Sequence, residues 1–207
     1  MAQALIDLVR QQFPAAVVGS HSQHGDDTVI VDSNAWKDVA RFLRDSPDAD
    51  MKLLVDLTAV DFPQKDPRFE VVLHLMSLNL GHRLRVKARV GGPDGEGAEL
   101  ESLTELWAAA NWAERETWDM FGIRFVGHPD LRRILLYPEF EGHPLRKDYP
   151  ADRIQPLVPY RDVGNIDKIA PFGSDEGMSF GRQTHDRRPE TPSGLEGVVS
   201  TRTGDEV

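Results

Sequence analysis

Residues 114 to 149 hold most of the side chains in this sequence whose types and spacing could support chemistry. Three carboxylates and an arginine lie within the stretch ERETWD, and the tripeptide Gly-His-Pro then follows twice. Two carboxylates beside an arginine can act as an acid/base pair, and two histidines with one carboxylate can form a metal site. The side chains in question are Glu114, Arg115, Glu116, Asp119, His128 and His143. They form either a reaction centre or part of a surface that binds another protein.

The stretch ERETWDMFG has the spacing of a helix. One helical face carries residues spaced i, i+3, i+4 and i+7, namely Trp112, Arg115, Glu116 and Asp119. The alternative to an acid/base pair is a set of ion pairs on the helix surface around an aromatic core contact. Such pairs are common and individually weak, so we expect surface ion pairing here.

The two Gly-His-Pro tripeptides predict two bends in the chain. Each histidine precedes a proline, which favours extended backbone, and each follows a glycine, which permits a sharp entry. Zinc and iron ligands more often sit at fixed spacing on one regular element, as in HExxH. A metal site made of His128, His143 and a carboxylate from Glu114, Glu116 or Asp119 remains the alternative.

Composition argues against several other classes of protein. The chain of 207 residues has no cysteine, which rules out disulfides, iron–sulfur ligation and cysteine-ligated zinc within it. It has no G-x-S-x-G elbow, and GGPDGEG lacks the ending of a phosphate-binding loop. The net charge of −10 disfavours generic binding to nucleic acid or anionic membranes. No apolar run approaches the roughly 20 residues of a membrane-spanning helix, so we expect a soluble chain.

The stretch RLRVKARV alternates strictly between apolar and basic residues, which predicts a strand with one buried face. The opposite face carries Arg83, Arg85, Lys87 and Arg89. A sheet that binds RNA would interleave aromatic residues for stacking, and this strand has none. We expect a solvated face or a docking face for an acidic partner, with RNA binding as the alternative.

The elements that must position these residues form a mixed domain. Helices are predicted from Leu5 to Phe13 and from an N-cap at Ser33 to near Ser46, with the strand TVIVD between them. The stretches MKLLVDLTAVDF and RFEVVLHLMSLNL predict two neighbouring strands. Two more helices are expected, at residues 102–107 and in NWAERETWDMF, the latter capped by Gly122. This order predicts an α+β fold with a mostly antiparallel sheet covered by helices.

The domain is predicted to span residues 1–150. Residues 151–207 contain few large apolar side chains and cannot bury enough surface to offset their ordering entropy. We therefore expect an extended or disordered tail that wraps a partner. Arginines and tryptophans, which are enriched at the centres of protein interfaces, gather just before this tail. Composition thus favours a component of a larger assembly.

The stretches ANWAERETWDMFGIRFVGHPDLRRILL and FEGHPLRKDYP closely resemble the signature of one family. It is the 30 kDa family, the peripheral-arm C subunit of respiratory complex I, NADH:quinone oxidoreductase. Residues 1–150 are covered by the resemblance. The matching positions are Glu114 to Glu116, Asp119, Phe121, Gly122, His128, Pro129, Arg133 to Leu135, and Gly142 to Pro150.

The resemblance implies a chain without cofactor or catalytic residues, while FMN and iron–sulfur clusters lie in partner subunits that oxidise NADH. It implies docking on the large quinone-site subunit, the D subunit, beside iron–sulfur subunits of the peripheral arm. Quinone is reached through the complex, no nucleic acid is bound, and the chain lies at the cytoplasmic face of the bacterial inner membrane.

In this interpretation the signature residues shape a rigid docking surface. Arg146 and Asp148 are expected in ion pairs or backbone hydrogen bonds, and the tail from Arg153 onward lies over the D subunit. The interface candidates are Glu114, Arg115, Glu116, Asp119, His128, Arg133, His143, Arg146, Lys147, Asp148 and Tyr149. The alternatives are the equivalent subunit of a related membrane-bound hydrogenase or other quinone-type dehydrogenase, and an independent metal-dependent enzyme.

Overall fold

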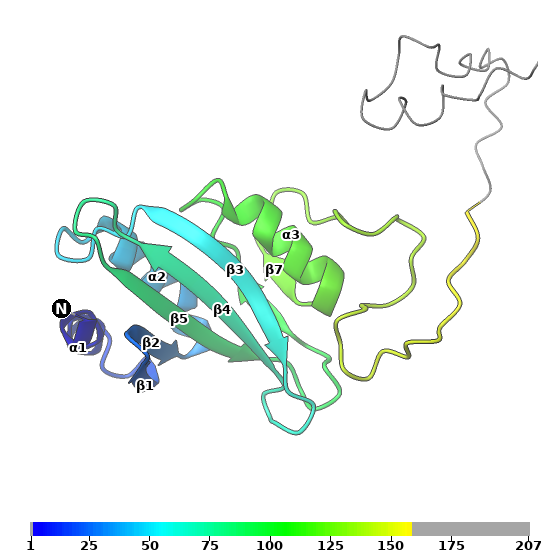
Figure 1. The fold of residues 1–207 in the computed structure, drawn as a ribbon, viewed down its shortest axis with the longest axis horizontal. Coiled ribbons are helices and arrows are strands. Elements are labelled where there is room, and N and C mark those ends of the chain that lie inside the picture. Colours follow the sequence, from blue (N-terminus) through cyan, green and yellow to red (C-terminus); the bar gives the residue numbers. More distant parts are fainter. Residues whose placement is uncertain (1, 159–207) are drawn as a thin grey trace, which may run out of the picture. The chain divides into compact units, whose positions relative to one another are not determined.

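The computed structural model describes residues 2–158, and these residues form a mixed domain built on a five-stranded sheet (Figure 1). The predicted α+β class is confirmed, and the tail beyond residue 158 lies outside the described residues. In chain order the elements are α1 (Ala2–Gln12), β1 (Val17–Gln23), β2 (Asp26–Val31), the 3-10 turn η1 (Ser33–Ala35), α2 (Trp36–Asp45), β3 (Leu53–Asp61), β4 (Phe69–Met76), β5 (Arg83–Val90), β6 (Glu99–Glu101), α3 (Ala110–Phe121) and β7 (Arg124–Val126).

The sheet has the strand order β1-β2-β5-β4-β3. The strands β2 and β5 run parallel, and the other three neighbouring pairs are antiparallel. The alternation predicted for β5 is confirmed, because its four apolar side chains are buried while its basic ones reach solvent or partners. The register places Val86 beside Leu73 of β4 and Val29 of β2, so the apolar rows of three strands meet on one face.

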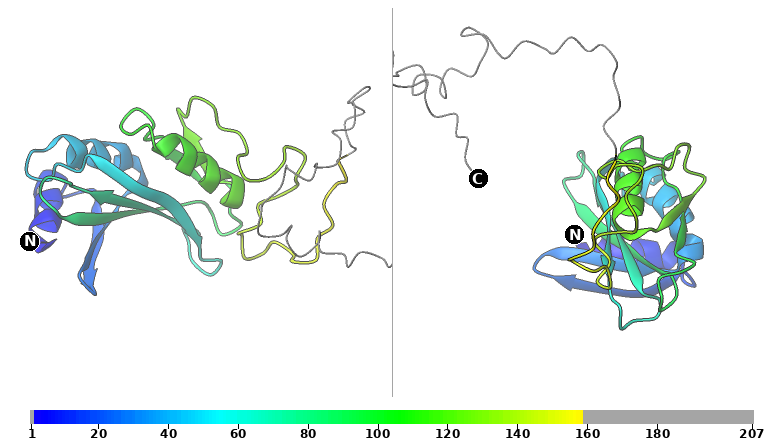
Figure 2. Two further views of the ribbon diagram at one scale, coloured as in Figure 1. Left: turned by 45° about the horizontal axis from the view of Figure 1, so that its top comes forward. Right: turned by 90° about the vertical axis from the view of Figure 1, so that its right-hand side faces the viewer.

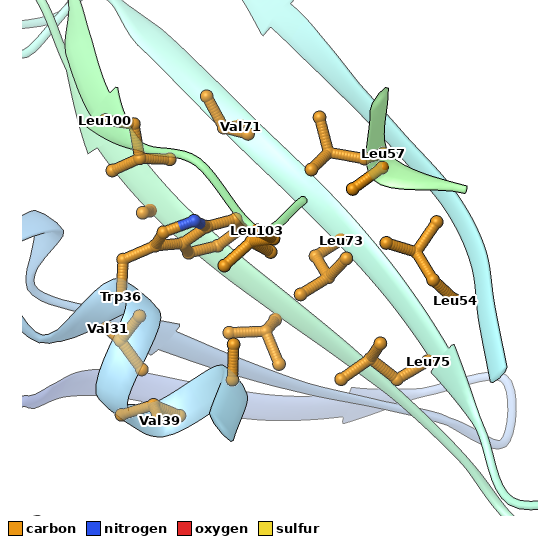
Figure 3. Packing of buried hydrophobic residues seen from close by; sticks show 14 of the residues in the cluster. Val31, Trp36, Val39, Leu54, Leu57, Val71, Leu73, Leu75, Leu100 and Leu103 are labelled. Atoms are coloured by element: carbon orange, nitrogen blue, oxygen red, sulfur yellow. The ribbon is translucent and has the colours of Figure 1, made fainter. Parts of the chain in front are cut away.

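Helices α1 and α2 close the core over that apolar face. The predicted apolar face of α2 is confirmed, since Trp36, Val39 and Leu43 are fully buried. Figure 3 shows Trp36 projecting from α2 across the face of the sheet, toward Leu103 and Leu73. Aromatic side chains bury the largest areas and dominate core energetics, so Trp36 fixes the position of α2 on the sheet.

Helix α3 lies along the edge strand β3, on the same side of the sheet as α2 (Figure 2). The Thr117 hydroxyl lies 2.8 Å from the Ala113 carbonyl of its own helix and 3.3 Å from the Leu57 carbonyl, so the helix covers part of an edge that would otherwise be open. Gly122 ends α3 with φ +78°, which confirms the predicted cap. The short strands β6 and β7 form a separate two-stranded parallel sheet beside the helix.

Two local expectations were wrong, and one strand was not predicted. Residues 102–107 form turns instead of a helix, because the Glu114 carboxylate binds the Leu103 N–H and the Ser102 hydroxyl, which favours a turn over a helix. The strand β1 was not anticipated, since its half-exposed residues VVGSHSQ show no clear alternation. The cap before α2 is made by Asp32, whose carboxylate binds the Asn34 N–H of η1, and not by Ser33.

Candidate partner-docking site

A buried ion pair lies at the turn between β3 and β4. Arg68 donates from Nε and Nη2 to the two oxygens of Asp61 at 2.7 and 2.8 Å, and both side chains are buried. Two parallel hydrogen bonds of this kind fix the geometry as well as the charge. The Arg68 hydrogen bond holds the pKa of the Asp61 carboxyl below its usual value, and the same contact raises the pKa of Arg68.

This pair binds the end of the signature segment. The backbone N–H of Lys147 donates to Asp61 at 2.7 Å, and Nη1 of Arg68 donates to Asp148 at 2.9 Å. The Arg68 hydrogen bond lowers the pKa of Asp148 as well. The prediction that Asp148 would be ion-paired is thus confirmed, and its partner lies inside the chain.

A second buried carboxylate, Asp119 of α3, organises the loop after β7. Its Oδ1 accepts from Arg133 at 2.6 Å. Its Oδ2 accepts the backbone N–H groups of Ile134, Leu135 and Leu136 at 3.0, 2.9 and 3.0 Å. Burial acts to raise the pKa of Asp119, but the Leu136 N–H and the Arg133 guanidinium outweigh it and lower the pKa.

The second Gly-His-Pro bend packs against the C-terminal end of α3. His143 Nδ1 lies 2.9 Å from the Asp119 carbonyl, and Arg146 Nε donates to the Phe121 carbonyl at 2.6 Å. These contacts satisfy carbonyls that a helix end leaves without partners. Burial lowers the pKa of His143. A Cβ added at Gly122 would lie 2.6 Å from His143 and Arg146, so only glycine fits at this crossing.

The first Gly-His-Pro bend lies at the other end of the helix. His128 Nε2 is 3.1 Å from the Asn111 carbonyl, and its Nδ1 accepts the Asp130 N–H at 3.0 Å. The two histidines therefore contact α3 at residues 111 and 119, about 12 Å apart along the axis at 1.5 Å per residue. Among residues 2–158 no group of three histidine or acidic side chains is arranged to hold a metal ion. This separation contradicts the alternative of one metal site holding both histidines.

Two side chains near the start of α3, Glu114 and Trp112, differ sharply in their burial. Glu114 is fully buried, and accepts from Ser102 Oγ at 2.7 Å and from the Leu103 N–H at 2.6 Å. Burial raises the pKa of Glu114 to about 7. Trp112 is 65% exposed. The expectation of ion pairs on the helix surface was wrong, because α3 turns Glu114 inward and because Asp119 pairs with Arg133 in a buried position.

Arg115 and Glu116 lie on the outer side of α3. Arg115 donates to the carbonyls of Arg132 and Arg133 at 3.1 Å each, which joins the helix to the following loop. Glu116 is exposed. Tyr149 stacks on Phe140 with ring centroids 6.1 Å apart, beyond the end of α3.

Residues 151–158 fold back on the loop that precedes them. Arg153 binds the Glu141 carboxylate at 2.6 Å, and Gln155 accepts the Glu141 N–H at 2.9 Å and also bonds Tyr149. Between and beyond these anchored residues, Ile154 and Leu157 are 92% and 96% exposed. The segment thus has polar side chains bound inward and large aliphatic side chains facing solvent, with Val158 also exposed.

The basic face of β5 is partly neutralised within the sheet. Glu70 of β4 binds Lys87 at 2.7 Å and Arg89 at 3.3 Å, and Asp26 of β2 binds Arg85 at 3.3 Å. Burial acts to raise the pKa of Glu70, but Lys87 and Arg89 more than offset this and lower it. These pairs favour the expected solvated or protein-facing strand over a track for phosphates.

Comparison with known proteins places this arrangement in a family. The family described as respiratory-chain NADH dehydrogenase, 30 kDa subunit, matches residues 29–155. The chain belongs to this 30 kDa subunit family. It is 45% identical over 174 residues to the NADH-quinone oxidoreductase C subunit of Rhodobacter capsulatus, covering 79% of this chain and 85% of the relative. It is 50% identical over 137 residues to the corresponding C subunit of Roseiflexus castenholzii, covering 66% and 77%.

Two solved structures extend the likeness to the fold. A trypsin-resistant fragment of Nqo5 superposes with a TM-score of 0.51 at 28% identity, covering 62% of this chain and 98% of the fragment. A chain of the membrane-bound sulfane sulfur reductase, an archaeal respiratory membrane complex, gives a TM-score of 0.60 at 27% identity, covering 72% and 85%. The resemblance to the 30 kDa family seen in the sequence is confirmed. Within residues 2–158, this family member has no helix with the length and apolar character to span a bilayer.

Two residues central to the site of this 30 kDa family member were not anticipated. Asp61 and Arg68 lie in the stretch DFPQKDPR, where proline and charge indicate only a turn. An aspartate and an arginine at the two ends of a predicted hairpin turn offered a weak signal. The hydrogen bond from the Lys147 N–H to Asp61 joins residues 86 positions apart, so no local sequence pattern indicates it.

Proposed function

We propose that this chain is the cofactor-free peripheral-arm subunit of a proton-pumping NADH:quinone oxidoreductase. In this proposal it docks on the large quinone-site D subunit, beside iron–sulfur subunits of the arm, and supports electron transfer from NADH to quinone. FMN and iron–sulfur clusters lie in the partners, this chain supplies no catalytic residue, and the complex holds it at the cytoplasmic face of the bacterial inner membrane. Family membership and the names of the relatives support the proposal.

The observation that carries the proposal is how the signature residues are used. Asp119, Arg133, His143 and Arg146 all bind partners within the chain. They therefore act as a scaffold that fixes the loops around α3. Reactive groups at an active site would instead face a cleft and leave room for a substrate.

The surface held by this scaffold is suited to binding a protein. Its loops carry four exposed aliphatic side chains: Leu135, Leu145, Ile154 and Leu157. We infer that they belong to one interaction surface, since exposed apolar patches mark sites where proteins bind. Because Arg153 and Gln155 hold the segment that carries them, little ordering entropy is lost when Ile154 and Leu157 enter a partner.

The test is the double variant Ile154→Asp/Leu157→Asp in the full chain. Tagged protein is purified from native membranes after mild detergent extraction, and the D subunit and NADH-dependent quinone reduction are quantified. We expect the variant to lose most of the co-purifying D subunit. The matched control is Leu78→Asp, which changes a 68% exposed leucine in the turn after β4 and should retain it. Wild-type recovery of the D subunit with the double variant would contradict the proposal.

A second candidate is the equivalent subunit of a related membrane-bound hydrogenase or other quinone-type dehydrogenase complex. The likeness to the sulfane sulfur reductase chain supports it, since that chain gives a TM-score of 0.60. The same purification separates the two candidates. Flavin and NADH-oxidising subunits in the purified assembly favour the first, and their replacement by hydrogenase-type subunits favours the second.

A further inference from the structure

A surface groove lies between the outer side of α3 and the loop at residues 131–138. Its volume is about 380 Å³. Its apolar lining is contributed by Trp118 of α3 and by Leu131, Leu136 and Pro138 of the loop. Among the described residues, the groove is also lined by three arginines and by no acidic side chain: Arg115, Arg132 and Arg133.

The three arginines differ in how their charge is balanced. Arg133 is paired with Asp119 at 2.6 Å, and Arg132 with Asp130 at 2.9 Å. Arg115 binds two backbone carbonyls but no carboxylate within residues 2–158. Its guanidinium also lies 5.7 Å from the ring of Trp112. The groove therefore has an uncompensated positive charge at one wall.

Exposed apolar side chains flank the groove. Trp112 is 65% exposed and Leu135 is 62% exposed. Tryptophan and arginine in the middle of an apolar depression are the residue types that dominate binding energy at protein interfaces. A ligand that matches this surface has an apolar side chain for the floor and a carboxylate within reach of Arg115.

We propose that this groove binds an acidic segment of a neighbouring subunit, in which a large apolar side chain lies next to an aspartate or glutamate. The inference rests on the proposed function, since it requires a partner over this face. It adds a second contact to the one made by Ile154 and Leu157. The proposed occupant is a carboxylate-bearing segment of a partner chain, because no carboxylate among residues 2–158 pairs with Arg115.

A photo-crosslinking amino acid at Pro138 in the full chain tests the proposal within the purified complex. Pro138 lines the groove, and the same probe at Leu78 serves as the control position. After irradiation, mass spectrometry identifies the captured peptide. The proposal predicts a peptide from a partner chain with a carboxylate adjacent to a large apolar residue.

A charge variant is combined with the probe. Arg115→Gln keeps hydrogen-bond donors for the loop carbonyls but removes the charge, and should lower the crosslink yield about tenfold, as expected for one lost charge-assisted hydrogen bond. Arg115→Lys should restore part of the yield. Arg124→Gln changes an exposed arginine paired with Glu99 and should have no effect. Unchanged melting temperature of the isolated chain shows that Arg115→Gln remains folded.

Several results would overturn the groove proposal while leaving D-subunit docking intact. The captured peptide could come from residues 159–207 of this chain or from a second copy. It could come from a partner but lack a carboxylate, or show a yield unchanged by Arg115→Gln. A yield no higher than at Leu78 would also overturn it. Co-purification of the D subunit, measured in the same sample, separates this failure from failure of the proposed function.

Discussion

The backbone N–H of Lys147 donates to the Asp61 carboxylate at 2.7 Å, across 86 positions of sequence. Asp61 is at the same time held by Arg68 through two hydrogen bonds. The charged cluster at residues 146–148 is thus fixed to the turn between β3 and β4. Its role within this chain is to hold the loops after α3 in one position on the sheet.

Replacing Arg68 should cost more stability than replacing an exposed arginine. Arg68→Met leaves the buried Asp61 charge without its main partner, and we expect a loss of about 3–5 kcal/mol in the free energy of unfolding. Arg41→Met removes an ion pair whose arginine is 44% exposed, and should cost less than about 1 kcal/mol. Urea denaturation of the isolated chain measures both. Equal losses would show that the buried pair does not organise the site.

Gly122 should be far less tolerant of alanine than another left-handed glycine. Gly97 has φ +65° with nothing within 4 Å of an added Cβ, so Gly97→Ala should cost only the backbone strain of about 1–2 kcal/mol. Gly122 has φ +78°, and an added Cβ would meet His143 and Arg146 at 2.6 Å. Overpacking should add roughly 1–3 kcal/mol. Thermal and urea unfolding of the two variants would reveal the difference, and similar values would refute the close approach.

Glu114 should make stability depend on pH between about 5 and 8. Its pKa in the folded chain is raised to about 7 from 4.5, so the folded state binds the extra proton. The contribution of Glu114 to the free energy of unfolding is therefore fully present below pH 4.5 and is lost as the pH rises through 7. At 1.36 kcal/mol per pKa unit, the difference between 4.5 and 7 corresponds to about 3 kcal/mol of folding stability.

The variant Glu114→Gln isolates this effect, because the amide can still bind Ser102 and the Leu103 N–H but does not titrate. We expect the variant to gain stability relative to the wild type as the pH is raised from 5 to 8. Glu116→Gln, at an exposed position on the same helix, is the control and should show no such gain. Parallel pH profiles for wild type and Glu114→Gln would contradict the assignment.

Local patterns predicted the elements better than the contacts between them. The β5 alternation and the Gly122 cap were readable because strand period and helix termination depend on neighbouring residues. The burial of Glu114 could not be predicted from neighbouring residues, because it depends on the turn at residues 102–107 packing against α3.

The charged residues of the signature were expected to lie at a docking surface, and the structure shows that most of them bind partners within the chain. Asp61 and Arg68 were not predicted as site residues, because a buried ion pair across a hairpin turn produces no periodic pattern in the sequence. The exposure of Ile154 and Leu157 depends on the ion pair between Arg153 and Glu141, and no local sequence pattern predicts this tertiary contact.

Hydrogen exchange of this chain, compared between the isolated protein and the purified complex, tests the docking role of the signature loops. We expect strong additional protection at residues 151–158 and at the loop of residues 131–138 upon assembly. Exchange around the buried Asp61–Arg68 pair should be slow in both states. Unchanged exchange at residues 151–158 in the assembled complex, with protection confined to other surfaces, would contradict the docking role assigned to the signature loops.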